Sequence, residues 1–89
     1  MTSIAVVILN YNGQDLLAQF LPSVVQHSTG AEIYVADNGS SDQSLTVLQA
    51  RFPGVKILAL GANLGFCGGY NTALAQIRAD YYVLLNSDV

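Results

Sequence analysis

Apolar and polar segments alternate along this chain in a pattern that predicts four strands and three helices. Four short apolar runs have the length of strands: residues 4–9 (IAVVIL), 32–37 (EIYVAD), 55–60 (VKILAL) and 81–85 (YYVLL). Such runs, rich in β-branched and aromatic residues, are typical of strands. Because they are nearly continuous, we expect strands that are covered on both faces, as in a parallel sheet.

Helical spacing marks the segments between these runs. Residues 14–26 (QDLLAQFLPSVVQ) form the first helical pattern, in which Pro22 predicts a kink or an early end. Ser40 or Ser41 can cap a second helix, which FPG ends, and a third is expected around Tyr70–Arg78. The first helix is expected to bury one apolar face, made of Leu16, Leu17, Phe20, Leu21, Val24 and Val25.

Strands that alternate with helices predict βαβ units and therefore an α/β protein with a parallel sheet. The carboxyl ends of parallel strands lie along one edge, and ligands bind outside that edge. Each expected strand is followed there by small, polar or acidic residues, namely NYNG, DNGSSD, GANLGFCGG and NSDV. The sequence therefore predicts a ligand site where these four clusters meet.

The composition narrows the possible partners. Of the 89 residues, 52% are hydrophobic and 10% are charged, with a formal net charge of -3. Only Arg51, Lys56 and Arg78 are cationic, so we expect no nucleic-acid partner. The apolar runs are too short to span a membrane, and the start lacks the features of a signal peptide. Cys67 is the only cysteine. A cytoplasmic location is the expectation.

The polar clusters also have simple structural interpretations. A turn and a helix cap account for residues 38–42, but Asp37 ends an apolar strand, where a carboxylate can bind a base or a ribose. The glycine-rich segment matches neither the dinucleotide fingerprint nor a P-loop, although a turn alone does not require Asn63 and Asn71. Asp88 offers the hard oxygen ligand that Mg²⁺ or Mn²⁺ prefers.

Four blocks, in order, resemble the inverting family 2 glycosyltransferases: VVILNYNG, YVADNGSSD, NLGFCGGYN and YVLLNSDV. The likeness is greatest to the rhamnosyltransferase-like branch and covers essentially the whole chain. It implies a Rossmann-like GT-A half-domain, with about four strands in the order 3-2-1-4 and three helices in βαβαβαβ order. It also implies that residues 1–89 are the N-terminal, sugar-nucleotide-binding part of a truncated glycosyltransferase domain.

The resemblance also assigns roles to single residues. Residues 10–12 would line the base pocket, Asp37 would hydrogen-bond the base, and Asn63, Gly65 and Asn71 would shape the ribose and diphosphate side. The nucleotide-binding residues that it implies are Asn10, Tyr11, Asn12, Asp37, Asn38, Asn63, Gly65, Asn71 and Asn86.

The segment Asn86-Ser87-Asp88 occupies the position of the family's D-x-D motif. By this resemblance Asp88 would hold Mg²⁺ or Mn²⁺ against the diphosphate, whereas Asn86 could hydrogen-bond the ribose but would not be a metal ligand. The reaction implied is displacement, with inversion, of a nucleoside diphosphate by a hydroxyl of an acceptor glycan or glycolipid. Thymidine-diphosphate rhamnose is the suggested donor. The general base is expected beyond Val89, so no catalytic residue is assigned and the chain alone is expected to be inactive.

Two other functions stay open from the residues themselves. A sugar-phosphate nucleotidylyltransferase-like enzyme would carry a basic, glycine-rich loop after the first strand, and NYNGQD has no Lys or Arg. A non-catalytic binding or assembly module would not need Asp88. Because the resemblance implies a truncated domain, the fourth strand is expected to form an open, apolar sheet edge, through which the fragment would self-associate. In a longer protein, a peripheral position at the cytoplasmic membrane face is a further expectation.

Overall fold

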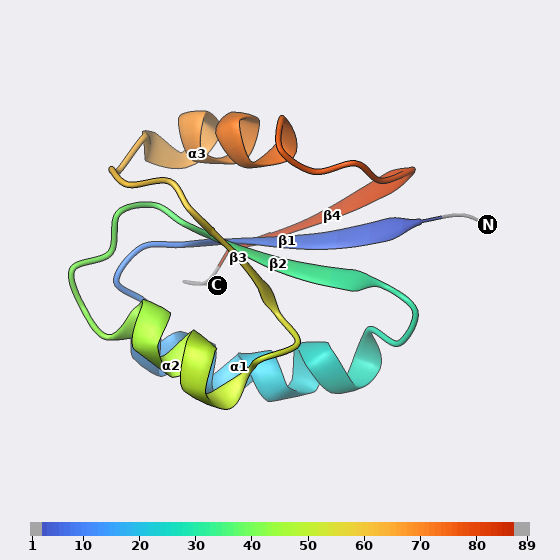
Figure 1. The fold of residues 1–89 in the computed structure, drawn as a ribbon, viewed down its shortest axis with the longest axis horizontal. Helices are drawn as coiled ribbons and strands as arrows, with labels where there is room; N and C mark the ends of the chain where they lie inside the picture. The colour runs from blue at the N-terminus through green and yellow to red at the C-terminus, as the bar shows by residue number, and fades with distance from the viewer. Residues whose placement is uncertain (1–2, 87–89) are drawn as a thin grey trace.

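The computed structural model describes residues 3–86 and contains the seven expected elements in the expected order (Figure 1). All strand pairs are parallel, and the sheet has the order β3-β2-β1-β4. The α/β fold class and the 3-2-1-4 strand order are therefore confirmed. The elements are β1 (Ile4–Asn10), α1 (Gln14–His27), β2 (Glu32–Asp37), α2 (Ser44–Arg51), β3 (Lys56–Ala59), α3 (Gly65–Leu74) and β4 (Tyr81–Asn86).

The helices cover the two faces of the sheet, with α1 and α2 on one side and α3 on the other (Figure 1). Because successive strand residues point to opposite faces, β1 contributes to both layers. Val6 and Ile8 pack with Leu17, Leu21 and Leu48 under the first two helices. On the other face, the core consists of Ala5, Val7, Leu9, Ala36, Tyr70, Ala73 and Ile77.

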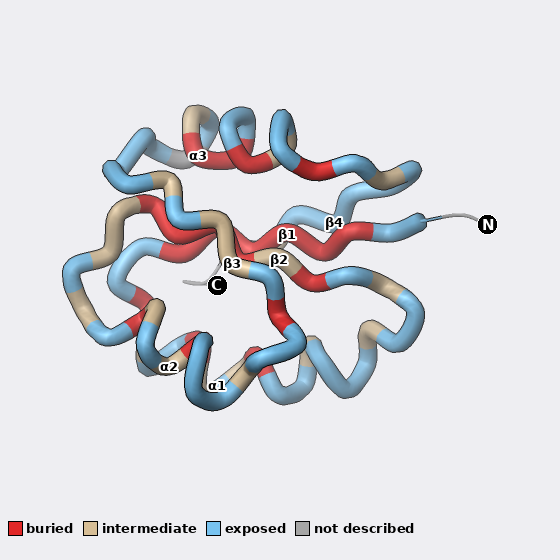
Figure 2. The backbone as a smooth tube through the Cα atoms, in the orientation of Figure 1, coloured by how far each residue is buried: buried red, intermediate tan, exposed pale blue. Residues whose placement is uncertain are grey.

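Burial falls from the middle of the sheet toward its edges (Figure 2). Residues 5–10 of β1 are all buried, whereas β3 is only partly buried and β4 is largely exposed. The continuous apolar pattern thus predicted two-sided burial correctly for the central strand and overestimated it for β4. Since β4 contacts only β1 among the described strands, its outer edge lacks the neighbour that such burial requires.

The prediction of an early end at Pro22 was wrong, because α1 continues through this residue to His27. A proline inside a helix removes one backbone hydrogen bond. Here the loss is offset by packing, because Leu17 and Leu21 are fully buried. The expected apolar face is also narrower than predicted, since Leu16 and Val25 are exposed.

The limits of the third helix also differ from the expectation of Tyr70–Arg78. The helix begins five residues earlier, at Gly65, and ends at Leu74. Its start is fixed by side chains from elsewhere, because Asn38 Oδ1 accepts a hydrogen bond from the Leu64 N–H at 2.9 Å. The spacing of apolar residues in the sequence does not predict such a long-range hydrogen bond.

Candidate functional site

Asn10 and Asp37 lie side by side at the carboxyl ends of β1 and β2, where they are partners in the strand register. Both are buried, with 0% and 2% of their surface exposed. The Asn10 Nδ2 group donates to Asp37 Oδ1 at 3.0 Å. Ser40 completes the cluster, because its hydroxyl donates to Asp37 Oδ1 at 2.6 Å and its N–H donates to Oδ2 at 2.9 Å. Three hydrogen bonds thus compensate for the burial of this carboxylate.

The side-chain oxygen of Asn10 is buried and has no hydrogen-bond partner in the structure. Buried polar atoms without a partner are uncommon in folded proteins. The atom is therefore an unused acceptor within the predicted site.

The loop after β1 is tied to the loop after β2 through Asn12. Its backbone is in the left-handed region, with φ of 51°. Its N–H donates to Ser40 Oγ at 2.8 Å, and its Oδ1 accepts from the Ser41 N–H at 2.7 Å. The backbone N–H and the side-chain oxygen of Asn12 are thereby used inside the protein. The neighbouring Tyr11 has 49% of its surface exposed.

Asp42 links the starts of α1 and α2. Its Oδ2 accepts from the Gln14 N–H at 3.1 Å, and its Oδ1 accepts from the Ser44 N–H at 2.9 Å. The prediction that Ser40 or Ser41 caps the second helix was therefore wrong, since the helix begins at Ser44 and Asp42 binds its first N–H. Burial raises the pKa of Asp42, but the hydrogen bonds from Ser44 and Gln14 outweigh it and leave the pKa below its ordinary value.

Asn38 connects the end of β2 to the glycine-rich loop before α3. Its side chain is buried and donates to Asn63 Oδ1 at 3.2 Å and to the Gly65 carbonyl oxygen at 3.1 Å. Gly39 approaches the same loop so closely that a Cβ atom there would lie 2.8 Å from the Cα of Ala62. The loops after β1, β2 and β3 therefore form one connected rim.

Asn63, Gly65 and Asn71 are exposed on this rim and the adjoining helix. Gly65, with φ of 77°, begins α3 at the rim. Asn86 ends β4 in register with Leu9 of β1. The sequence thus predicted correctly that the loops after β1, β2 and β3 meet at this edge.

The sequence patterns did not reveal three contributors to the rim. Ser40 joins two loops, Asp42 links the starts of two helices, and Gln14 donates its N–H to Asp42. The spacing of Asp37 to Ser40 and of Asp42 to Ser44 is typical of local side-chain turns and could have indicated the first two.

Asp88, the expected metal ligand, lies outside the described residues. Within residues 3–86, no three His, Cys, Asp or Glu side chains cluster closely enough to hold a metal ion. In the same range, no helix is both long and apolar enough to cross a membrane.

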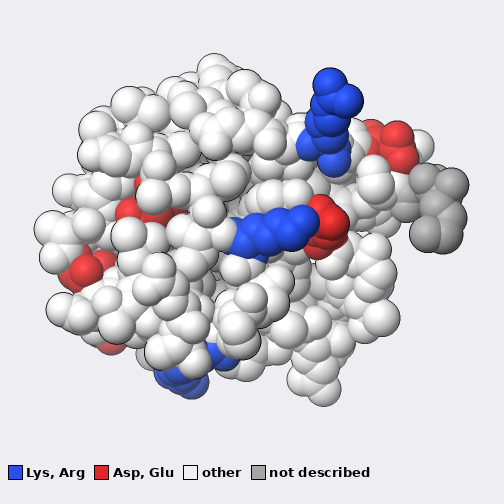
Figure 3. All heavy atoms as spheres, in the orientation of Figure 1, with Lys and Arg blue, Asp and Glu red and all other residues white. Residues whose placement is uncertain are grey.

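Charge is unevenly distributed over the molecule. The three cationic residues belong to the end of α2, the start of β3 and the segment after α3, all at the amino ends of the strands. In Figure 3 the edge at the left, where the rim loops lie, shows acidic atoms and no Lys or Arg atoms. The described rim therefore carries the carboxylates of Asp37 and Asp42 and no Lys or Arg side chain.

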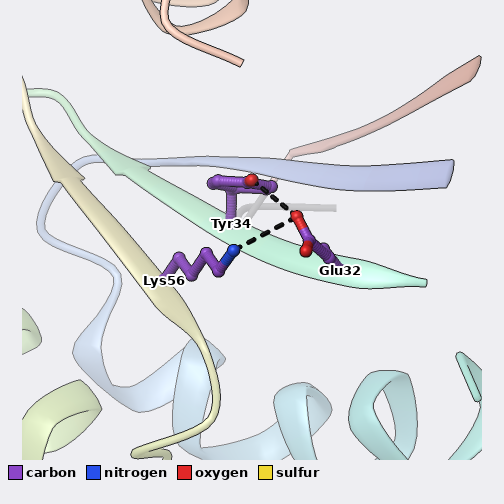
Figure 4. A network of polar contacts seen from close by, with 3 residues as sticks. All are labelled: Glu32, Tyr34 and Lys56. Atoms are coloured by element: carbon purple, nitrogen blue, oxygen red, sulfur yellow. Dashed lines mark hydrogen bonds and ion pairs between the residues drawn. The ribbon is translucent and has the colours of Figure 1, made fainter. Parts of the chain in front are cut away.

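A cavity of about 420 Å³ lies at the opposite end of the sheet, between the amino ends of β2 and β3. Beside it, Lys56 pairs with Glu32 at 3.2 Å, and the Tyr34 hydroxyl donates to the same carboxylate (Figure 4). The hydrogen bond from Tyr34, with the help of Lys56, lowers the pKa of Glu32, and the Glu32 hydrogen bonds raise those of Tyr34 and Lys56. Because this network is exposed and far from the rim, we interpret it as a surface ion pair.

The fold and the rim together define a class: a Rossmann-like α/β domain whose ligand edge is built from the loops after parallel strands. The sequence profile described as Glycosyl transferase family 2 matches residues 5–89. The chain therefore belongs to glycosyl transferase family 2.

Individual relatives agree with this assignment. An N-acetylglucosaminyl-diphospho-decaprenol L-rhamnosyltransferase of Mycobacterium tuberculosis is 33% identical over 94% of this chain and 31% of its own length. An undecaprenyl-phosphate 4-deoxy-4-formamido-L-arabinose transferase of Edwardsiella ictaluri is 33% identical over 97% of this chain and 29% of its length. The chain thus spans about a third of the length of these curated relatives.

Solved structures share the fold. A fragment of S. aureus TarS in complex with UDP is 26% identical, with a TM-score of 0.82, over 97% of this chain and 27% of that one. The glucosyl-3-phosphoglycerate synthase of Mycobacterium tuberculosis is 21% identical, with the same TM-score, over 97% of this chain and 33% of that one, and shows the fold alone. These similarities confirm the expected GT-A architecture.

Proposed function

We propose that this chain is the donor-binding portion of a glycosyltransferase, and that its rim binds the nucleoside-diphosphate part of a sugar nucleotide. One observation carries the proposal. In a family 2 chain, the loops after β1, β2 and β3 are joined by Asn12, Ser40 and Asn38 into one polar edge. Edges of this kind are where open parallel sheets bind their ligands.

The base would lie against the end of β1. Tyr11 offers an exposed aromatic face there for stacking. Asn10 Oδ1 has no hydrogen-bond partner, but it is buried, so a base would reach it only after the neighbouring side chains moved. Asp37 is the residue expected to bind the base, but both of its oxygens already accept hydrogen bonds. A base N–H would therefore add a fourth bond to this carboxylate or displace the Ser40 hydroxyl.

The ribose and diphosphate would lie toward the start of α3. Asn63 and Gly65 are exposed there, Asn71 is exposed further along the same helix, and the N-terminal end of a helix favours negative charge. Asn86, beside β1, completes this set as the ribose contact.

We further propose that donor binding requires a divalent metal ion, Mg²⁺ or Mn²⁺, held by Asp88. The support is electrostatic, because the described rim carries Asp37 and Asp42 but no Lys or Arg to balance a diphosphate. Hard divalent cations commonly bind one or two carboxylates together with substrate phosphates. When bound, such an ion would neutralise charge on the leaving diphosphate.

For the whole protein, we propose transfer of the sugar to a hydroxyl group of a glycan or glycolipid, with inversion at the anomeric carbon. A thymidine-diphosphate rhamnose donor is supported by the relative named as an L-rhamnosyltransferase. The alternative of a nucleotidylyltransferase-like enzyme has no support in the family match.

A titration of the ¹⁵N-labelled chain with thymidine and uridine diphosphates, with and without Mg²⁺, tests donor binding. We expect saturable shifts at residues 10–12 and 63–71, and tighter binding with metal. Loss of one base-stacking contact costs about 1–3 kcal/mol, so Tyr11→Ala should weaken binding roughly 5- to 160-fold.

Tyr81→Ala is the matched control, because it removes another exposed tyrosine from outside the rim. It should leave nucleotide affinity unchanged, whereas Asp88→Asn should abolish the effect of Mg²⁺. A folded sample that binds neither diphosphate would contradict the proposal and favour a non-catalytic assembly module.

A further inference from the structure

Tyr11 lies in a short connection, residues 11–13, between β1 and α1. The connection is fixed at both ends, because β1 ends at the buried Asn10 and α1 begins at Gln14. Between these ends, Tyr11 keeps 49% of its surface exposed. Since the connection is so short, the backbone conformation of Asn12 affects where the tyrosine ring lies.

Asn12 has an uncommon backbone conformation. Its φ is 51°, and among residues 3–86 it is the only residue other than glycine with a positive φ. Asparagine tolerates this left-handed region better than most residues do. Sparsely populated conformations persist only where the surrounding structure holds them, and they are frequent at binding sites. The contacts that hold Asn12 therefore indicate what the turn does.

The turn at Asn12 is held against the loop after β2, which lies beside it (Figure 1). The Asn12 N–H donates to Ser40 Oγ at 2.8 Å. Its Oδ1 accepts from the backbone N–H groups of Ser41 at 2.7 Å and Asp42 at 3.2 Å. Because two of the three donors are backbone groups, these contacts do not depend on the rotamers of flexible side chains.

Ser40 ties this turn to the end of the sheet. Its hydroxyl accepts from Asn10 Nδ2 at 3.3 Å and donates to Asp37 Oδ1 at 2.6 Å. Asn10 and Asp37 are buried partners in the register of β1 and β2. The turn that carries Tyr11 is therefore anchored to the most rigid part of the rim.

We propose that Asn12 is a positioning residue, which holds Tyr11 in place for stacking on the base and does not act by contacting the nucleotide. This inference rests on the proposed function. It differs from the role that the resemblance implies for Asn12, because the N–H and Oδ1 of this residue are bonded inside the protein. A ring that is held before binding loses less conformational freedom when the ligand arrives, and the affinity is higher for that reason.

Two substitutions of Asn12 separate the turn from direct contact. Asn12→Gly permits positive φ but removes the Oδ1 acceptor. Asn12→Asp keeps an oxygen acceptor and tolerates the left-handed backbone, and it removes only the Nδ2 group. In ¹⁵N relaxation without nucleotide, the order parameter of the Tyr11 amide should fall from about 0.85 to below about 0.6 in Asn12→Gly. It should stay at the wild-type value in Asn12→Asp.

A double-mutant cycle then tests whether Asn12 acts through Tyr11. Thymidine diphosphate with Mg²⁺ is titrated into the wild-type chain, Asn12→Gly, Tyr11→Ala and the double variant. Asn12→Gly should weaken binding roughly 3- to 10-fold, as expected when a side chain must be ordered on binding. In the Tyr11→Ala background the same change should alter affinity by less than about twofold, because the ring that it positions is gone.

Two comparisons complete the experiment. Asn12→Asp is titrated with thymidine, an uncharged probe, because a new carboxylate would repel a diphosphate; its affinity should stay within about twofold of the wild type. Ile33→Val is the matched control, since it is a mild core change at the amino end of β2, away from the rim. It should leave both the order of Tyr11 and the affinity unchanged. Circular dichroism confirms that each variant is folded.

Equal losses in the two backgrounds would overturn the inference, because Asn12 would then act independently of Tyr11. An Asn12→Asp chain that binds thymidine as poorly as Asn12→Gly does would also overturn it and would assign Nδ2 a direct contact. Both results leave donor binding intact. A folded wild-type chain that binds no thymidine diphosphate would instead contradict the proposed function, and this inference with it.

Discussion

Gly39 is the position at which a single methyl group should disturb the rim most. Its φ is 81°, and a Cβ atom would lie 2.8 Å from the Cα and carbonyl carbon of Ala62 and 2.9 Å from the Asn63 nitrogen. Those neighbours are backbone atoms of the loop that Asn38 holds through hydrogen bonds, so they cannot turn aside as a flexible side chain would. Gly39→Ala therefore forces the loops after β2 and β3 apart.

Two effects contribute to the cost of Gly39→Ala. Left-handed backbone costs a residue with a Cβ atom about 1–2 kcal/mol. Favourable carbon–carbon contacts lie at about 3.5–4.0 Å, so the 2.8 Å approach is strongly repulsive. Relief of such overpacking typically costs a further 1–3 kcal/mol or so. The expected loss of unfolding free energy is thus about 2–5 kcal/mol, or at least about 8 °C in Tm for a domain of this size.

Gly61 and Gly30 provide matched controls, because they have φ of 84° and 88° but no atom within 4 Å of an added Cβ. Gly61→Ala and Gly30→Ala should each cost only the backbone component, about 1–2 kcal/mol. Urea denaturation of the three variants gives their unfolding free energies. The difference between Gly39→Ala and the two controls is the cost of the close contact with Ala62 and Asn63 alone. If Gly39→Ala is no less stable than the two controls, the close packing of the two loops is refuted.

Three further perturbations test other parts of the structure. Ser40→Ala removes a hydroxyl that donates to the buried Asp37 carboxylate, and should cost about 1.5–3 kcal/mol in urea denaturation, whereas the exposed Ser41→Ala should cost little. The pKa of Asp42 is lowered in the folded protein, so this carboxylate should stabilise the fold fully above pH 3.8, its ordinary pKa, and progressively less as the pH falls through the lower folded pKa. Asp42→Asn should therefore make the unfolding free energy less dependent on pH in acid. Leu17→Ala, at a fully buried site, should cost about 2–5 kcal/mol, and more than Leu16→Ala at its 39% exposed neighbour in thermal unfolding.

The element order was predictable from local patterns, whereas the strand order 3-2-1-4 followed from the family resemblance. Given that order, right-handed crossovers place α1 and α2 on one face and α3 on the other. Helix limits were not predictable in the same way. The start of α3 depends on Asn38, which lies 26 residues before Leu64 in the chain. The start of α2 depends on a carboxylate at Asp42, although serines at residues 40 and 41 were equally good local candidates.

For the rim residues, too, the location was predictable from the sequence but the contacts of each side chain were not. Convergence of the loops follows from the parallel sheet alone, so the sequence indicated that Asn10, Asp37 and Asn63 belong to one edge. What each side chain does there depends on burial, which a single sequence does not reveal. Asp37 and Asn38 proved to be buried, whereas Tyr11 is half exposed.

The buried and the exposed residues of the rim would contribute differently to nucleotide binding. The buried residues, with Ser40, are bonded to one another and hold the loops in place, so a ligand gains little from them unless it breaks an existing bond. The exposed groups, Tyr11 above all, are free to contact a ligand without that cost. Substitutions of Asp37 should therefore lower stability and affinity together, whereas Tyr11→Ala should lower affinity alone. The two kinds of residue can be separated by measuring unfolding and nucleotide binding on the same variants.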